Sequence, residues 1–360
     1  MKYIDEYRNP EIIKKLAEAI KKISSASYTF MEVCGGHTAA IQRFGIPALL
    51  PENIRLLSGP GCPVCVTSTD FIDKITKLSL EPGTIIATFG DLIRVPGSEL
   101  SLDKCRSEGA DIRIIFSPLE AVSIASVNPS RKVIFPGIGF ETTAPGTAVA
   151  IKKAKEKGLR NFKVLSAHKI MPPAMEAIIR DGTRLNGFIC PGHVSTIAGS
   201  KIFNFIPEKY GLGCVVSGFE PADILQSILM LVKQVNNNLP AVEIEYRRAV
   251  KPDGNETALR NMQEVFEICD SWWRGLGIIP ASGLRIRKEY RDFDAEEAFT
   301  FETSSTDENP LCICGNILRG LATPSECPLF GKVCNNDNPV GACMVSAEGS
   351  CNIHLKYHPS

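Results

Sequence analysis

Residues 54–78, IRLLSGPGCPVCVTSTDFIDKITKL, contain the unit that decides the fold: a short, mainly apolar run, a turn rich in glycine and proline, and a helical stretch. The apolar run predicts a buried strand, and the pattern from Ser68 to Leu78 predicts a helix. The same order of features recurs from about residue 27 to residue 240. Short strands that alternate with helices are typical of parallel sheets of the α/β class. We therefore predict strands at 28–33, 54–57, 84–89, 111–116, 132–135, 162–165, 187–190 and 213–216.

A weak internal repeat suggests that these units form two lobes. The stretch 33–37 resembles 165–168, and 59–62 resembles 190–193 at the same offset, although chance similarity between such units explains the matches about equally well. After residue 238 the chain becomes more charged, and six of its 13 cysteines fall within 312–351. We predict two similar parallel-sheet α/β lobes, at 1–125 and 126–240, and a smaller, loop-rich third unit at 241–360 that is organised by metal.

Composition and charge exclude several classes of protein. The 360 residues include 40 acidic and 40 basic side chains, and the formal net charge of zero gives no bulk electrostatic reason to expect nucleic acid or an anionic membrane as partner. No run of 18 apolar residues predicts a membrane span, and residues 1–23 have the pattern of a surface helix rather than of a signal peptide. We expect a cytoplasmic protein, where clustered cysteines favour metal or redox chemistry over structural disulfides.

The cysteines near the end of the chain predict a metal centre. Thiolates are soft ligands suited to zinc or to an iron–sulfur cluster. Zinc sites usually draw on two close C-x2-C pairs, whereas the spacings among four of these cysteines are long and uneven, which suits a cubane approached from several loops. Two further thiols could form a disulfide that exchanges electrons with the cluster, and the alternative is a zinc knot that holds the tail together. The four are Cys312, Cys327, Cys334 and Cys351, and the further two are Cys314 and Cys343.

A second group of cysteines follows the first two predicted strands. Cys62 and Cys65 form a C-x-x-C pair between a strand and a helix, where a helix N-terminus is expected to lower the pKa of a thiol. Both disulfide exchange and metal capture remain open for this pair. Cys34, two glycines and His37 follow the preceding strand. Because the carboxyl ends of parallel strands meet at one edge of a sheet, we expect the three thiols and the imidazole to face one cleft.

The remaining motifs give no specific prediction of function. The turn 137–143 superficially resembles a nucleotide-binding turn, but it lacks the third glycine and no lysine follows it, which argues against nucleotide binding. His168 is interpreted as a structural histidine. Buried, incidental roles are predicted for Cys105, Cys190, Cys214 and Cys269.

Several of these motifs together resemble the HypD family of hydrogenase maturation proteins. The resemblance extends over nearly the whole chain and implies two α/β lobes with an iron–sulfur cluster domain. It also implies a scaffold for building the Fe(CN)2CO group of [NiFe] hydrogenases, a small HypC-type chaperone, and a HypE-type cyanide donor that carries a thiocyanate. The matching stretches are Met31–Thr38, Gly59–Cys65, Gly139–Pro145, Pro191–Ser195, Glu326–Gly331 and Pro339–Ser346.

The resemblance also implies roles for individual residues. It places the ligands of a [4Fe-4S] cluster at Cys312, Cys327, Cys334 and Cys351, and a redox disulfide at Cys314 and Cys343. Cys62 and Cys65 would be the cleft dithiol, and Cys34 would hold iron together with a cysteine of the chaperone, so that all three thiols serve the iron. His37 and Asp91 are predicted to assist by proton transfer or hydrogen bonding.

Two other functions are compatible with the sequence. One is an iron–sulfur-dependent thiol–disulfide oxidoreductase, in which the cluster reduces the Cys62–Cys65 pair for a protein substrate. The other is a zinc-stabilised binding module. The scaffold is distinguished from both by iron beyond the cluster and by CN and CO stretches in the infrared.

Overall fold

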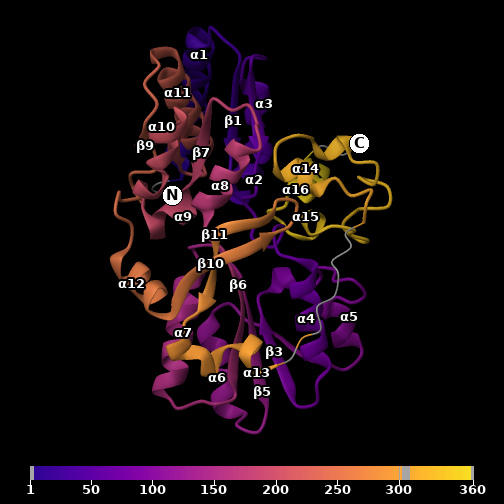
Figure 1. Ribbon diagram of the computed structural model, residues 1–360. Helices are drawn as coiled ribbons and strands as arrows, with labels where there is room; N and C mark the ends of the chain where they lie inside the picture. Colours follow the sequence, from indigo (N-terminus) through magenta and orange to yellow (C-terminus); the bar gives the residue numbers. More distant parts are fainter. Residues whose placement is uncertain (1–3, 300, 302–308, 358–360) are drawn as a thin grey trace.

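The computed structural model describes residues 4–299, 301 and 309–357 (Figure 1). Its first sheet has five parallel strands in the order β2-β1-β7-β8-β9. Four of these strands, β1, β2, β7 and β8, were predicted from apolar runs, and the short strand β9 extends the sheet. The strands are β1 (Tyr28–Glu32), β2 (Ile54–Ser58), β7 (Gly187–Pro191), β8 (Gly213–Ser217) and β9 (Val242–Ile244).

Helices cover both faces of this sheet. Because side chains alternate along a strand, Tyr28 and Phe30 pack with Ile20 and Leu225 on one face, while Met31 faces the interior of the molecule. Asn9 caps the first helix and Pro10 occupies its first position, as the sequence predicts. The helices around this sheet are η1 (Asp5–Arg8), α1 (Pro10–Ile23), α2 (Gly35–Arg43), α3 (Ile46–Leu49), α9 (Gly192–Ala198), η3 (Lys201–Phe203), α10 (Phe205–Tyr210) and α11 (Pro221–Asn237).

The second sheet has four parallel strands in the order β4-β3-β5-β6. One face packs on the alanine-rich α6 and α7, and the other packs on α4 and α5. The strands are β3 (Thr84–Thr88), β4 (Asp111–Ile114), β5 (Lys132–Gly139) and β6 (Phe162–His168). The helices are α4 (Thr69–Leu80), η2 (Gly90–Leu92), α5 (Leu102–Ser107), α6 (Pro118–Val127) and α7 (Ala144–Glu156). The helix α8 (Met171–Arg180) leads from β6 to β7 and lies with the elements of the first sheet (Figure 1).

An antiparallel hairpin crosses between the two sheets (Figure 1). It is bound to the end of β6, since the N–H of Ile170 donates to the carbonyl of Ser282 at 2.9 Å. The hairpin strands are β10 (Phe266–Trp273) and β11 (Gly277–Ile286), flanked by α12 (Glu256–Val265), η4 (Lys288–Phe293) and α13 (Ala295–Ala298).

The cysteine-rich region, residues 309–357, packs beside α2 at the edge of the first sheet (Figure 1). It consists of short helices joined by loops, as predicted for the third unit. These are α14 (Cys314–Leu318), η5 (Pro324–Glu326), α15 (Ala342–Val345) and α16 (Ser350–Tyr357).

The fold class is confirmed: two parallel-sheet lobes and a loop-rich, cysteine-containing third unit. The sheets, however, cross the continuous boundaries 1–125 and 126–240 that the sequence suggested. The strands β7 and β8 pair beside β1 in the first sheet, and β3 and β4 belong to the second sheet. The third unit does not begin at 241 either, because β9 completes the first sheet. Parallel strands are joined by long crossovers, so strand order along the chain does not determine which strands pair.

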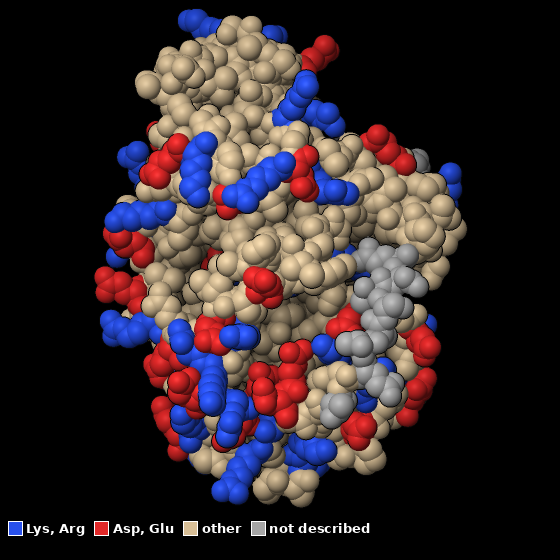
Figure 2. All heavy atoms as spheres, in the orientation of Figure 1, with Lys and Arg blue, Asp and Glu red and all other residues tan. Residues whose placement is uncertain are grey.

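No helix among the described residues is long and apolar enough to cross a lipid bilayer. On the face shown in Figure 2, acidic and basic side chains are interspersed. This distribution agrees with the balanced composition.

Candidate functional site

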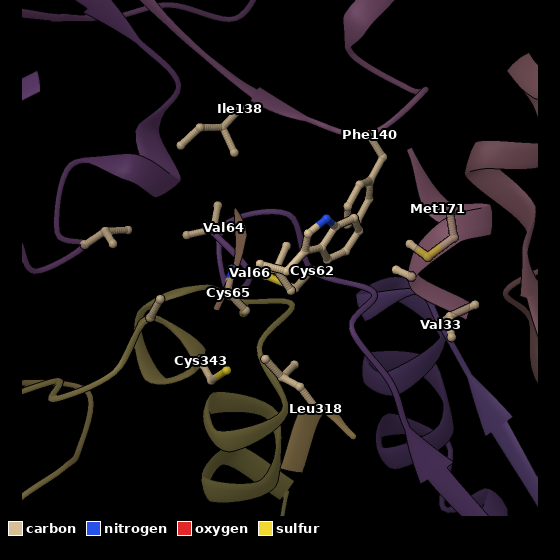
Figure 3. Packing of buried hydrophobic residues seen from close by; sticks show 14 of the residues in the cluster. Val33, Cys62, Val64, Cys65, Val66, Ile138, Phe140, Met171, Leu318 and Cys343 are labelled. Carbon is tan, nitrogen blue, oxygen red and sulfur yellow. Dashed lines mark hydrogen bonds between the residues drawn. The ribbon is translucent and has the colours of Figure 1, made fainter. Parts of the chain in front are cut away.

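The carboxyl ends of strands from both sheets meet at one apolar cluster. Figure 3 shows Val33, which follows β1, together with Cys62 and Cys65, which follow β2, near Ile138 and Phe140 at the end of β5. This arrangement confirms that the cysteines lie at strand ends, where loops of α/β proteins form binding sites.

The C-x-x-C loop is buried in this cluster. Cys62 is 3% exposed and Cys65 is not exposed at all. The N–H of Cys65 donates to Sγ of Cys62 at 3.3 Å. The expectation of a lowered thiol pKa is wrong for Cys65, because burial raises its pKa well above the ordinary value. The helix that was expected to lower it begins only at Thr69.

Cys34 lies next to this loop at the start of α2. The N–H of Gly35 donates to the carbonyl of Gly61 at 3.2 Å, and a Cβ on Gly61 would lie 2.2 Å from the nitrogen of Cys34. Glycine is therefore required at position 61 for the two loops to meet. Burial, with smaller contributions from Glu348 and Glu32, raises the pKa of Cys34 to about 12.

A buried carboxylate, that of Glu32, is hydrogen-bonded to the loop that begins with Cys34. Glu32 accepts hydrogen bonds from the hydroxyls of Thr38 and Ser58, and from the N–H of Cys34 at 3.0 Å. Burial outweighs these bonds and raises the pKa of Glu32 to about 7. Glu32 also lines a pocket of about 170 Å³ between α2 and the cysteine-rich region.

His37 is close to Cys34 in sequence but is directed toward β8. Its Nε2 lies 3.2 Å from the carbonyl of Ser217 and 3.0 Å from that of Gly218, so Nε2 carries the proton. Burial lowers the pKa of His37 to about 4, which makes the ring neutral. The ring stacks on Phe219, whose other side stacks on His193. The assignment of His37 to proton transfer stays a prediction.

Asp91 is connected to the site by the carboxylate of Glu348, a residue to which the sequence did not point. Asp91 lies in η2, at the end of β3, and acts on Glu348, whose pKa is raised mainly by burial and further by Asp91. Burial also raises the pKa of Asp91 itself. Because Glu348 in turn acts on Cys34, Asp91 is linked to the thiol through Glu348.

One short segment of the cysteine-rich region covers the three cleft thiols in order. The thiol of Cys343 interacts with that of Cys65, and Figure 3 shows Cys343 beside the C-x-x-C loop. Sγ of Cys62 lies 3.3 Å from the hydroxyl of Ser346. Glu348 lies against the Cys34 loop, since a Cβ on Gly35 would be 2.4 Å from its Cβ. We call residues 343–348 the covering segment.

The terminal cysteines line a single cavity together with apolar side chains. Cys314 is central, since it interacts with Cys312, Cys343 and Cys351. A Cβ on Gly341 would lie 3.3 Å from Sγ of Cys312, so glycine keeps this wall open. The cavity is lined by Cys312, Cys314, Cys327, Cys334, Cys343 and Cys351, with Ile317, Leu329, Phe330, Gly341 and Met344.

All thirteen cysteines are unpaired thiols in the structure. The redox disulfide implied for Cys314 and Cys343 stays a prediction, and the two thiols interact with each other. Within the described ranges, no three His, Cys, Asp or Glu side chains are placed to hold one metal ion together. The assignment of Cys34, Cys62 and Cys65 to iron stays a prediction.

The hairpin tip contributes a buried cation to the same junction. The N–H of Arg274 donates to the carbonyl of Val66 at 2.9 Å, and its Nη2 donates to the hydroxyl of Thr69 at 3.0 Å. Arg274 is 6% exposed. The only sequence signal for this residue is an arginine directly after two tryptophans.

The second sheet carries buried ionisable groups of its own. His168 is within hydrogen-bond distance of Thr147 and Ser166 at its two ring nitrogens, which agrees with a structural role. Lys169 donates to the hydroxyl of Ser271 and to the carbonyl of Trp272. In the turn 137–143, Glu141 accepts from the N–H of Met171 through Oε1, while its buried Oε2 has no partner.

Sequence reasoning missed Glu32, Arg274, Ser346 and Glu348. A carboxylate inside the apolar run 28–33 was the available signal for Glu32. Ser346 ends one of the stretches that resemble the HypD family, but its contact with Cys62, like that of Glu348 with the Cys34 loop, joins positions far apart in the chain and has no local signal.

Comparisons with known proteins give a consistent result. Residues 11–358 match the family model described as "HypD: Hydrogenase formation hypA family". The chain is 47% identical over 368 residues to hydrogenase maturation factor HypD2 of Bradyrhizobium diazoefficiens, covering 99% of this chain and 97% of the relative. It is 48% identical over 367 residues to hydrogenase maturation factor HypD of Azotobacter vinelandii, with the same coverage. It is also 47% identical over 345 residues to a putative hydrogenase expression/formation protein of Methanocaldococcus jannaschii, covering 96% and 95%.

Proposed function

The chain belongs to the HypD family of hydrogenase formation proteins, and on this basis we propose that it is the scaffold on which the Fe(CN)2CO group of [NiFe] hydrogenase is assembled. In this proposal Cys34, Cys62 and Cys65 bind the iron, which is the cargo. The observation that carries the proposal is the covering segment, which connects the cleft thiols to the terminal cysteine cavity through the contact between Cys65 and Cys343.

The terminal cavity suits a [4Fe-4S] cluster. Cys312, Cys327, Cys334 and Cys351 would hold it, and the lining of thiols and apolar side chains is the donor set that such a cluster requires. When bound, the cluster would supply one-electron redox chemistry close to Cys314 and Cys343.

Cys314 and Cys343 would pass two electrons to the cleft by thiol exchange. The thiolate of Cys343 attacks Sγ of Cys65 in a Cys62–Cys65 disulfide, so that the Cys343–Cys65 bond forms and the thiolate of Cys62 leaves. Cys314 then attacks Cys343, which forms the Cys314–Cys343 disulfide and releases Cys65 as a thiolate. Electrons and atoms balance within the chain, and the cleft dithiol ends reduced.

Iron held by the cleft thiols would accept cyanide that a partner protein delivers as a thiocyanate. Release of cyanide from a thiocyanate, RSCN + 2e⁻ → RS⁻ + CN⁻, consumes the two electrons that the dithiol holds. We propose a HypE-type donor for the thiocyanate and a small HypC-type chaperone whose cysteine shares the iron with Cys34. We also propose a cytoplasmic location, since clustered cysteines in a reducing compartment favour metal or redox chemistry over structural disulfides.

The structure does not favour the alternative of a general disulfide oxidoreductase. Cys62 and Cys65 lie under the covering segment, at 3% and 0% exposure. A protein disulfide must reach an attacking thiol directly, and a thiocyanate on a partner protein must also reach the site, so either approach requires the covering segment to move. The contact between Cys65 and Cys343 that the relay uses needs no such movement.

Two substitutions test the division into two sites. Cys62→Ala is expected to abolish hydrogenase maturation and the CN and CO infrared bands of the complex with the chaperone, while the cluster absorbance near 400 nm is retained. Cys327→Ala is expected to remove that absorbance. Cys105→Ala, a buried thiol outside both sites, is the control and should retain both signals. Loss of the cluster in Cys62→Ala would contradict the division.

A further inference from the structure

Three aromatic rings stack at the carboxyl edge of the first sheet. Phe219 follows β8, and the centroid of its ring lies 4.5 Å from that of His37 and 4.0 Å from that of His193. The planes of each pair are inclined by 23° and 22°. His37 belongs to α2, which follows β1, and His193 belongs to α9, which follows β7. We call these three residues the ring stack, and it joins the ends of three neighbouring strands.

Two glycines make room for the central ring. A Cβ on Gly36 would lie 3.0 Å from Cε1 of Phe219, and a Cβ on Gly192 would lie 3.0 Å from Cε2. A methyl group at either position would crowd the ring, because side chains at such contacts have little space to give way. The phenyl ring is therefore confined on both faces by imidazoles and at two edge atoms by backbone.

The ring stack is attached to the loop that carries Cys34. The same Cβ on Gly36 would lie 3.6 Å from Sγ of Cys34, so Phe219 and the thiol are both neighbours of this glycine. The N–H of His37 donates to the carbonyl of Cys34 at 2.8 Å. Nε2 of His37 lies 3.0 Å from the carbonyl of Gly218, the residue before Phe219. A displacement of the ring stack would therefore reach the backbone of Cys34.

We propose that Phe219 and His193 are positioning residues for Cys34: stacked with His37, they hold the loop that carries the thiol in the conformation that binds iron. This inference rests on the proposed function, in which Cys34 shares the iron with a cysteine of the chaperone. Stacked rings stabilise a structure beyond the area that they bury, and a loop that is already ordered loses less entropy on binding. His193 is the exposed member of the stack, so it can be replaced without disturbing the core.

Hydrogen exchange of the chain alone tests the ordering of the loop. His193→Ala removes one face of the stack and is expected to speed exchange of the amides of residues 35–38 about threefold. His193→Phe keeps a ring in place and should leave this exchange unchanged. Phe219→Leu removes both ring contacts and is expected to speed it about tenfold. If Phe219→Leu does not fold, the two His193 variants decide the question.

Phe266→Leu is the matched control. Phe266 in β10 forms a second phenyl–imidazole pair, with its ring centroid 5.5 Å from that of His168, and it packs in the core of the second lobe. Because Phe266 is 2% exposed, its replacement should lower the temperature of thermal unfolding more than Phe219→Leu does. It should nevertheless leave exchange at residues 35–38 unchanged.

Infrared spectra of the complex with the small chaperone connect the ring stack to the iron. The shape of the CN and CO bands reports on the surroundings of the iron, and their area reports on how much of it is bound. In Phe219→Leu and His193→Ala the bands are expected to broaden and shift, because the thiol is held in several conformations. A purely structural defect would reduce the area and leave the band shape of wild type.

The outcomes separate this inference from the proposed function. A wild-type complex without CN and CO bands would overturn the scaffold function. When those bands are present, unchanged exchange at residues 35–38 in Phe219→Leu and His193→Ala, or band shapes like those of wild type, would overturn the role of the ring stack. Equal effects of His193→Phe and His193→Ala would show that the imidazole itself is needed, and would overturn stacking as the cause.

Discussion

At the scale of single residues, burial controls the ionisable groups around the cleft. Desolvation raises the pKa of Cys34 and Glu32 and lowers that of His37, in each case favouring the neutral form. A neutral thiol is a poor metal ligand, because metals bind the thiolate. The iron binding that we propose for Cys34 would therefore be coupled to release of a proton, with the metal supplying the compensating charge.

Glu141 gives a prediction for the pH dependence of stability. Burial raises its pKa to about 7, so between pH 4.5 and 7 the folded state binds more protons than the unfolded state, and stability from this group falls as pH rises. Glu141→Gln removes the ionisable carboxyl group, and with it this loss of stability at higher pH. The stability of the variant relative to wild type should therefore increase by roughly 3 kcal/mol between pH 4.5 and pH 8. Urea unfolding at several pH values measures the change.

Glu176 is the control with the opposite sign. Its pKa is lowered, chiefly by the hydrogen bond from Tyr210. Glu176→Gln should lose stability relative to wild type as pH rises toward the ordinary carboxyl pKa of 4.5 from below, and should change little above it. A flat difference between Glu141→Gln and wild type across the pH range given for Glu141 would contradict the buried, proton-binding carboxyl.

At the scale of elements, the turn of the β10–β11 hairpin links the lobes to the cysteine-rich region. Gly275 and Gly277 both have positive φ, +77° and +76°. They differ in surroundings, since a Cβ on Gly275 would meet α14, whereas one on Gly277 has nothing within 4 Å. The pair therefore separates backbone strain from the contact.

We expect Gly277→Ala to cost about 1 kcal/mol of unfolding free energy, the strain of a left-handed alanine. Gly275→Ala should cost roughly 3 kcal/mol, because the new methyl group also displaces the backbone of α14. Hydrogen exchange should show lost protection at Cys314–Leu318 in Gly275→Ala alone. Equal effects of the two substitutions would contradict the contact.

Local patterns predicted the elements that this region depends on, but not their contacts. All eight predicted strands are present, as β1 to β8, because apolar runs bounded by glycine and proline are local signals, whereas β9, β10 and β11 were not predicted. The placement of Cys34, Cys62 and Cys65 at strand ends followed from the same pattern. The prediction of a lowered thiol pKa was wrong for Cys65, because the burial that raises this pKa depends on the covering segment. The contacts of Cys65 with Cys343 and of Val66 with Arg274 have no local signal.

At the scale of the whole molecule, the two lobes are interleaved. The chain passes from the first sheet to the second after β2 and returns before β7. The first sheet is thus built from two separate stretches, while the four strands of the second lie in one stretch. Parallel pairing of this kind could not be derived from the sequence, because it depends on contacts between distant segments.

This topology predicts how fragments behave. Residues 1–125 contain β1 and β2 without β7, so this fragment should show no cooperative thermal transition by circular dichroism. Residues 67–183 contain all of β3 to β6 and should unfold cooperatively, at a lower temperature than the full chain because the hairpin is missing. A cooperative transition of the 1–125 fragment would contradict the interleaved assignment.

The covering segment is synthesised long after the thiols that it covers. Cys62 and Ser346 are neighbours in space but 284 residues apart in the chain. At ribosomal rates of about 5–20 residues per second, the cleft thiols are made roughly 14–57 s before the segment that encloses them. The first sheet also cannot be completed until its central part has been synthesised, since the N–H of Thr29 donates a hydrogen bond to the side chain of Asn186, 157 residues later. The sulfurs on which the site depends are therefore among the first groups synthesised and the last to be shielded from solvent.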